Sequence, residues 1–256
     1  MSGSVDLSVA DGIATLALNN PARLNAFTPA MLRQLDAHCA ALDGDDTIRC
    51  VILCGLGDRA FCAGADINAW ADYAPADFAR IWVRDGHRIF DRLARLSRPT
   101  IAVLQAHAFG GGLELAACCD IRVMAPGATL ALPETKVGIV PGWSGTQRLS
   151  RLIPMPVLRE MAIFGRRVDA ARALQLGIAA EVADDPLAAA LAIAAALHTS
   201  SPRAVEVVKY MLNAAAGEDR EAMIEALGSG MIAATEDKAE GVASFRAKRK
   251  PEFTGR

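Results

Sequence analysis

Three short strand-like segments, separated by helical segments, constrain the fold of this chain more than any other feature. Two of them, 50–53 and 101–104, are continuous apolar runs, which are typical of buried strands, and 121–124 is the third. Helical spacing of apolar residues follows over 77–96, and a shorter helix is expected over 113–118. Strands that alternate with helices in this way indicate α/β organisation.

The chain begins with a predicted hairpin. Alternating apolar residues over 5–9 and 13–18 flank Asp11-Gly12, a dipeptide typical of two-residue hairpin turns. A helix is then expected to begin at Thr28, which serves as its N-cap, with Pro29 at the first helical position.

Beyond Pro154 the strand signals fade and helical patterns replace them. The Thr-Ser-Ser-Pro stretch over 199–202 is the expected hinge. We therefore expect a core over residues 1–198 and a helical segment over 199–256. No internal repeat is visible in the sequence.

Composition excludes several classes of protein. With 52% hydrophobic residues among 256, the chain can bury enough apolar surface to fold without disorder. A net charge of −2 and 5% aromatic residues argue against a nucleic-acid partner. No apolar run has the roughly 20 residues of a membrane-spanning helix, and no signal peptide is visible at the start. Six cysteines without a regular framework indicate reduced, buried thiols and a cytoplasmic protein.

The strongest local signal is Gly110-Gly111-Gly112, which follows a predicted strand and precedes a predicted helix. Such a turn leaves backbone N–H groups uncovered at the positive end of the helix, where an oxyanion can bind. Glu114 lies three residues beyond Gly111, so its carboxylate can share a face with that N–H group. Taken alone, a helix-opening turn with a solvated glutamate is the more frequent arrangement.

Two further segments are candidates for parts of the same kind of site. Small residues over 61–66 follow a buried strand, and the Ala65 N–H is a possible second donor, although Asp66 is equally suited to cap a helix. Pro133 places Glu134 in an irregular apolar segment, where a carboxyl group acquires a raised pKa and serves as acid or base. The alternative for Glu134 is a surface loop.

Together these segments offer two backbone donors and two carboxylates. That set suits a reaction through an oxyanion, such as the conversion of a thioester to an enolate, and it requires no metal or redox cofactor. The four histidines lack metal-ligand spacing. The stretch 142–146 resembles a nucleophile elbow around Ser144, but Thr146 replaces the final glycine, which disfavours a serine hydrolase.

In its motifs the chain resembles the enoyl-CoA hydratase/isomerase (crotonase) family over nearly its whole length. The matching stretches are 20–26, 59–67, 110–120, 132–134, 138–142, 145–149 and 245–253. The resemblance implies an α/β fold, a crotonase-like spiral of ββα units, followed by a helical segment that builds homotrimers or homohexamers.

The same resemblance implies roles for the candidate residues. The N–H groups of Ala65 and Gly111 would hold the thioester oxygen. Glu114 would act as base and Glu134 as acid, and the Gly142 N–H would help place the water. The implied reaction is the hydration of 2-trans-enoyl-CoA thioesters, with no cofactor because CoA is part of the substrate. An enoyl-CoA isomerase, which can work with one glutamate, is the alternative.

Further positions correspond to substrate and CoA contacts in that family. These positions are Arg23, Leu24, Ala63, Asp66, Ile67, Phe245 and Lys248. Trp143 and Ser144 depart from the small pair that often follows the glycine at 142, and a bulky ring there would reshape the acyl pocket. A binding-only protein that contacts RNA through its basic tail, 246–250, is a competing reading that the net charge disfavours.

Overall fold

The computed structural model describes residues 3–256, and the predicted hairpin stands at its start. Strand β1 (Ser4–Ala10) pairs antiparallel with β2 (Ile13–Asn19). Between them Asp11 and Gly12 have φ angles of 50° and 71°. Positive φ at both turn positions matches the right-handed twist of the strands, and Asp and Gly tolerate it well.

The predicted buried strands form the centre of a six-stranded sheet. Its order is β1-β2-β3-β5-β7-β10, and the strands from β2 onward run parallel. Three of its members confirm the strands predicted from the sequence: β3 (Cys50–Gly55), β5 (Thr100–Leu104) and β7 (Ile121–Met124). The edge strand β10 (Glu181–Val182) is too short to give a sequence signal.

A second sheet has the order β4-β6-β8-β9. Its strands are β4 (Ala60–Cys62), β6 (His107–Phe109), β8 (Thr129–Ala131) and β9 (Val168–Asp169). Each of β3, β5 and β7 is followed by a strand of this second sheet and then by helix. The chain therefore repeats a ββα unit, as the resemblance implies, although its sequence shows no repeat.

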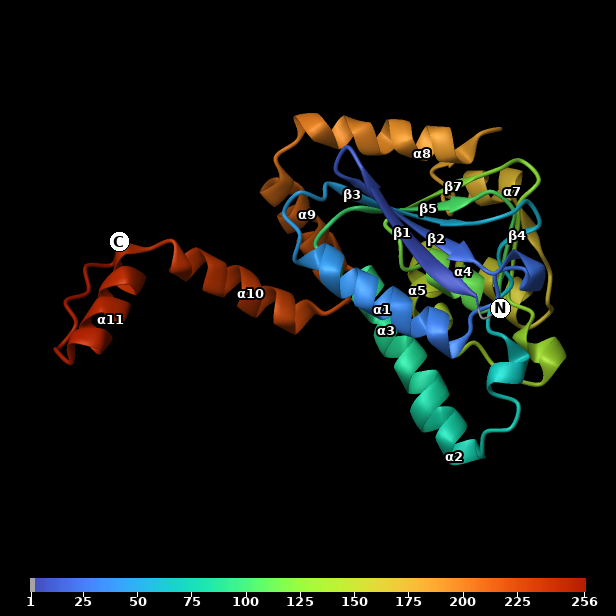
Figure 1. Cartoon of the computed structure of the whole chain (residues 1–256), viewed down its shortest axis with the longest axis horizontal. Helices are drawn as coiled ribbons and strands as arrows, with labels where there is room; N and C mark the ends of the chain where they lie inside the picture. Colours follow the sequence, from blue (N-terminus) through green and yellow to red (C-terminus); the bar gives the residue numbers. More distant parts are fainter. Residues whose placement is uncertain (1–2) are drawn as a thin grey trace. The chain divides into compact units, whose positions relative to one another are not determined.

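Helices cover both faces of the six-stranded sheet (Figure 1). Helix α8 (Pro186–Ala195) packs on one face, and α1 (Pro29–Asp43), α3 (Arg84–Ala94) and α4 (Gly111–Ala116) lie on the other. Side chains of β3 alternate between the two layers, since Ile52 faces α8 and Leu53 faces the opposite core. Burial on both faces explains why β3 is continuously apolar over 50–53.

Two helical predictions have different outcomes. Thr28 caps α1 as predicted, because its hydroxyl accepts the Met31 N–H at 3.3 Å. The single helix expected over 77–96 is instead α2 (Pro75–Asp77), the π-helix η3 (Phe78–Val83) and α3. A π-helical turn shifts the side-chain register, which apolar spacing in the sequence does not reveal.

The remaining helical segments of the first part of the chain connect these layers. They are η1 (Pro21–Arg23), η2 (Ile67–Ala69), η4 (Glu134–Val137), α5 (Gly145–Leu152), α6 (Met155–Ala162), α7 (Ala170–Gln175) and η5 (Ala196–Thr199). Along residues 3–256, no helix combines the length and the apolar character that crossing a membrane requires.

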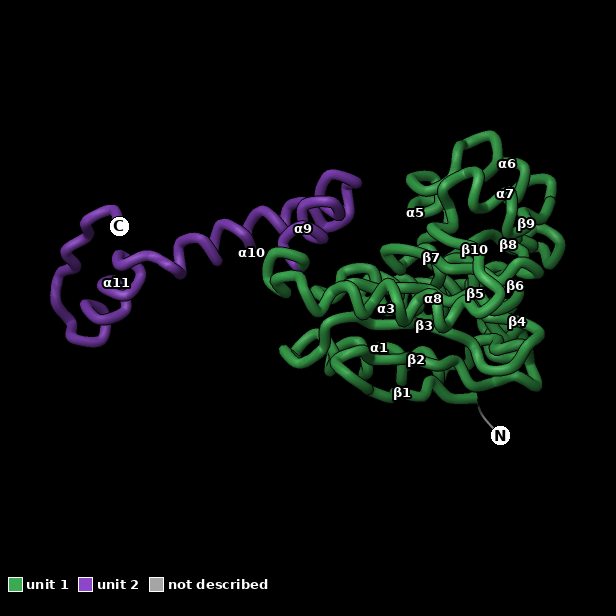
Figure 2. The backbone as a smooth tube through the Cα atoms, turned by 90° about the horizontal axis from the view of Figure 1, so that it is seen from above, with its two compact units in different colours: residues 1–205 green, residues 206–256 purple. Residues whose placement is uncertain are grey.

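The chain divides into two units, one ending at Val205 and the other covering Glu206–Arg256 (Figure 2). The break falls within α9 (Pro202–Ala215), a few residues beyond the expected hinge at 199–202. The second unit continues with α10 (Arg220–Ala233) and α11 (Glu236–Ala247). It carries exposed apolar side chains, among them Met211, Leu212, Ile224, Met231, Ile232 and Phe245.

Candidate active site

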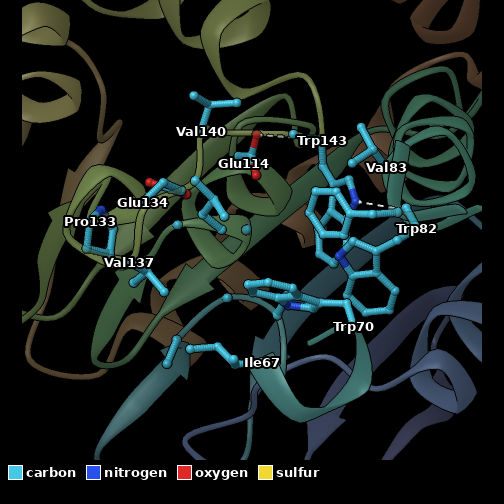
Figure 3. Close-up of a pocket in the computed structure, with 18 residues that line it drawn as sticks. Ile67, Trp70, Trp82, Val83, Glu114, Pro133, Glu134, Val137, Val140 and Trp143 are labelled. Atoms are coloured by element: carbon cyan, nitrogen blue, oxygen red, sulfur yellow. Dashed lines mark hydrogen bonds between the residues drawn. The ribbon is translucent and has the colours of Figure 1, made fainter. Parts of the chain in front are cut away.

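A cavity of about 120 Å³ brings the central site predictions together (Figure 3). Ala65, Gly111, Glu114 and Glu134 all line it. The other lining residues are Ala63, Gly64, Ile67, Trp70, Phe78, Trp82, Val83, Gly110, Pro133, Val137, Ile139, Val140, Gly142 and Trp143. Apart from the two carboxylates and the backbone, the wall is largely apolar, which is the usual character of a small-molecule site.

The two predicted donor segments lie against each other. A Cβ added to Gly64, whose φ is +104°, would be 3.3 Å from the Gly111 nitrogen. A Cβ on Gly112 would come within 2.1 Å of the Cys62 carbonyl oxygen, so only glycine permits this approach of α4 to β4. Within residues 3–256, neither the Ala65 N–H nor the Gly111 N–H donates to another protein group. Both donors are therefore available to a ligand in the cavity.

Glu114 is buried on α4 and held by the turn that precedes α5. Its Oε1 accepts the N–H groups of Trp143 and Gly145, each at 2.8 Å. Burial raises the pKa of this carboxyl group, whereas N–H groups of the turn, that of Gly142 included, and the charge of Arg148 oppose the rise. A Cβ on Gly145 would lie 2.6 Å from Glu114 Oε1, which makes glycine necessary there.

Glu134 begins η4 directly after Pro133 and is also buried, which excludes the surface-loop alternative. Its Oε2 has no hydrogen-bond partner in the described part of the chain. Burial, together with the negative charge of Glu114, raises its pKa to about 7, although its own backbone N–H opposes the rise. Two N–H groups reach Glu114 Oε1 and favour its ionised form, whereas no donor within residues 3–256 reaches Glu134 Oε2.

The other predicted contact residues are distributed more widely. Ala63, Ile67 and Gly142 line the cavity. Asp66 forms an ion pair with Arg23 and caps η2 by accepting the Asn68 N–H at 3.1 Å, so the capping alternative is confirmed for it. The two carboxylate oxygens of Asp66 thus have protein partners.

Besides Arg23 and Asp66, three further predicted contact residues lie outside the cavity lining. Leu24 lines a small separate hollow that also includes Asn25 and Leu56. Phe245 and Lys248 belong to the second unit, in α11 and at its C-cap. Their contact with CoA stays a prediction.

Sequence reasoning missed part of the cavity wall. Phe78, Trp82 and Val83 come from η3, inside the segment 77–96 whose apolar spacing predicted only a helix. Val137 and Val140 come from the segment around η4, where they are 47% and 73% exposed. Valines in an irregular glycine- and proline-containing segment were the available signal, since such side chains have no core to enter.

The structure also brings together three polar side chains, Ser144, His87 and Asp91, which the sequence did not connect. Ser144 Oγ lies 2.9 Å from His87 Nδ1 and 3.1 Å from Nε2, and His87 Nε2 lies 3.5 Å from Asp91 Oδ2. Ser144 is not among the described residues that line the cavity with the free N–H groups. The contact therefore ties the turn before α5 to α3. Among residues 3–256, no group of three or more His, Cys, Asp or Glu side chains is arranged to hold a metal ion.

Comparison with known proteins now decides the family. The sequence model described as enoyl-CoA hydratase/isomerase matches residues 8–256. The chain belongs to the enoyl-CoA hydratase/isomerase family. This finding confirms the resemblance drawn from the motifs.

Individual members of the enoyl-CoA hydratase/isomerase family agree with this assignment. YngF of Bacillus subtilis is 37% identical over 251 residues, covering 95% of each chain. A crotonyl-CoA hydratase of Syntrophomonas wolfei is 33% identical over 98% of this chain and 97% of its own. The crystal structure of an enoyl-CoA hydratase from Bacillus anthracis matches with a TM-score of 0.80, 32% identity and 100% coverage of both chains.

Membership also fixes the chemical class of the ligand. The enoyl-CoA hydratase/isomerase family acts on acyl-CoA substrates. The apolar cavity with its free N–H groups is therefore the candidate binding site for an acyl thioester.

Proposed function

We propose that this protein hydrates 2-trans-enoyl-CoA thioesters to 3-hydroxyacyl-CoA. The observation that carries the proposal is the pair of buried carboxyl groups, Glu114 and Glu134, which line one cavity with unequal hydrogen bonding. Addition of water across a double bond needs both a base for the water and an acid for the adjacent carbon. The name of the Syntrophomonas relative, a crotonyl-CoA hydratase, supports the same reaction.

In this proposal the thioester oxygen binds the N–H groups of Ala65 and Gly111. The support is their shared cavity and their lack of protein acceptors within residues 3–256. Negative charge grows on that oxygen as the enolate-like state forms, so the donors stabilise the transition state more than the substrate. Each such donor in a dry site contributes about 3–4 kcal/mol.

The proposed proton transfers follow from the different surroundings of the two carboxyl groups. Glu114, ionised with its Oε1 held by N–H groups, accepts a proton from water through its other oxygen while the water oxygen bonds to C3. Glu134, whose pKa is raised to about 7, gives its proton to C2. The new C–O and C–H bonds replace the double bond, and the two carboxyl groups then exchange protons with solvent to restore the starting state.

An enoyl-CoA isomerase is the competing activity, because moving a double bond requires only one carboxyl group. The two are separated by incubating the protein with crotonyl-CoA and, in parallel, with a 3-enoyl-CoA. Hydration consumes the absorbance of the conjugated thioester, whereas isomerisation of the 3-enoyl-CoA creates it. Isomerisation without loss of crotonyl-CoA would overturn the proposed hydratase.

The proposal also includes the oligomeric state of the protein and its cellular compartment. The apolar side chains exposed on the second unit support a homotrimer or homohexamer, in which Phe245 and Lys248 would reach CoA bound by Arg23, Leu24 and Ala63. The six cysteines are free and buried, which supports a reducing cytoplasm. Light scattering on the purified protein measures the oligomer, and a monomer would contradict this part.

A further inference from the structure

We infer that the indole ring of Trp143 closes the inner end of the acyl cavity and restricts the enzyme to short acyl chains. The inference rests on the proposed function and names the substrate class within it. Three observations carry it: the fixed position of the ring, its place beside Gly111, and the gradient of exposure along the cavity.

The Trp143 ring is fixed on several sides. Its indole N–H donates to the Trp82 carbonyl oxygen at 3.3 Å. Ring centroids of Trp82, Phe90 and Phe27 lie 5.3, 5.1 and 6.2 Å away, at tilted or edge-on angles that suit aromatic pairs. Trp143 is only 3% exposed. A side chain enclosed in this way does not swing aside to admit a longer ligand.

Two glycines frame the same ring. A Cβ on Gly86 in α3 would lie 2.1 Å from the Trp143 indole nitrogen. A Cβ on Gly111 would lie 3.0 Å from the far edge of the ring, at Cε3 and Cζ3. The indole therefore fills the space between α3 and Gly111, whose N–H is proposed to bind the thioester oxygen.

Exposure shows which end of the cavity is open. Ile67, Val137 and Val140 are 48%, 47% and 73% exposed and form its rim, whereas Trp82 and Trp143 are buried at its base. In Figure 3, Trp82 and Trp143 lie across the cavity from Glu134 and Pro133. CoA, which is far larger than the cavity, stays at the rim, so the acyl tail points toward the tryptophans.

The volume sets the expected length. An apolar cavity of about 150 Å³ takes one benzene molecule. The cavity here measures about 120 Å³. It therefore suits an acyl group of about six carbons or fewer, counted against that benzene standard.

The test compares kcat/KM for 2-enoyl-CoA thioesters of four, six and ten carbons. The wild type is expected to hydrate the ten-carbon substrate at least tenfold less efficiently than the four-carbon one. Trp143→Ala keeps the backbone N–H that holds Glu114 but removes the end wall, and it is expected to raise the ten-to-four ratio at least tenfold. Because the ratio is taken on one sample, a reduced folded fraction cancels.

A second variant changes the surroundings of the Trp143 ring on the α3 side. Gly86→Ala pushes the indole toward the cavity, so the six-to-four ratio is expected to fall. Met161→Ala is the matched control, because Met161 is fully buried on α6 but does not line the cavity. It is expected to loosen the core and leave both ratios unchanged.

Binding provides a readout that does not depend on turnover. Titration calorimetry with saturated butyryl-CoA and decanoyl-CoA is expected to favour butyryl-CoA in the wild type and to lose that preference in Trp143→Ala. Equal handling of both lengths by the wild type, or an unchanged preference in Trp143→Ala, would overturn the inference. A chain-length preference in binding without any hydration would instead overturn the proposed function alone.

Discussion

Glu114 and Glu134 line one cavity, yet Glu114 Oε1 accepts two backbone N–H groups while Glu134 Oε2 accepts none from residues 3–256. Burial raises the pKa of both carboxyl groups. The N–H groups of Gly142, Trp143 and Gly145 oppose the rise at Glu114, whereas the residue's own backbone N–H opposes it at Glu134. The asymmetry comes from the backbone of the turn at 143–145, since the two side chains are chemically alike.

The first prediction concerns the pH dependence of turnover. Because burial raises the pKa of Glu134 to about 7, kcat/KM for crotonyl-CoA is expected to fall about tenfold per pH unit above neutrality as the acid is lost. Steady-state rates from pH 6 to 9 measure this. A profile that stays flat up to pH 9 would remove Glu134 from the role of acid.

The second prediction concerns stability. The folded pKa of Glu134 is about 7, raised from 4.5, so the folded state binds more protons and loses stability as pH rises between these values. The loss amounts to about 3 kcal/mol at full ionisation. Glu134→Gln has no carboxyl group to ionise at this position. The free energy of unfolding in urea is therefore expected to differ less between pH 5 and pH 8 in the variant than in the wild type. Equal pH effects in both proteins would contradict the prediction.

The third prediction concerns the base. Glu114→Gln keeps the shape of the side chain and an oxygen for the Trp143 and Gly145 N–H groups, but it cannot accept a proton from water. The kcat for crotonyl-CoA hydration is expected to fall about 10²–10⁴-fold. Glu181→Gln, on the exposed edge strand β10, is the matched control and is expected to retain activity. Undiminished turnover in Glu114→Gln would exclude the assigned base.

The fourth prediction concerns the close approach of Gly145 to Glu114. An alanine Cβ there would meet Oε1 at 2.6 Å, so the carboxylate must move away from its donors. Gly145→Ala is expected to lower kcat tenfold or more and to destabilise the fold by about 1–3 kcal/mol. Gly127→Ala, where a Cβ meets nothing within 4 Å, serves as the control for both measurements. Similar behaviour of the two variants would show that the contact is unimportant.

The fifth prediction concerns Ser144, which has a φ of 75° and a hydroxyl within hydrogen-bond distance of His87. Ser144→Ala loses the hydrogen bond and keeps the left-handed backbone, so unfolding is expected to cost about 1–2 kcal/mol less. Ser144→Gly loses the same bond but adopts positive φ freely, so it is expected to be the more stable of the two. Thermal melts measure the difference, and the reverse order would show that strain at this position is absent.

Local sequence determined a large part of the fold. The three predicted strands became β3, β5 and β7, Asp11-Gly12 became the hairpin turn, and Thr28 capped α1. These features depend on a few neighbouring residues, because strand burial, turn conformation and capping are set by side-chain type and spacing. The glycines at 110–112 and the motifs around them likewise pointed to the cavity and to the family.

Only the tertiary structure decided the rest. Strands β4, β9 and β10 have two or three residues each, too few for periodicity, and they exist because neighbouring strands supply their hydrogen bonds. Trp82 lines the cavity from the π-helix η3, and the contact of Ser144 with His87 joins residues 57 positions apart. The unequal donors around Glu114 and Glu134 depend on which backbone N–H groups reach each buried oxygen. That is a property of packing between distant segments, which residue types alone do not encode.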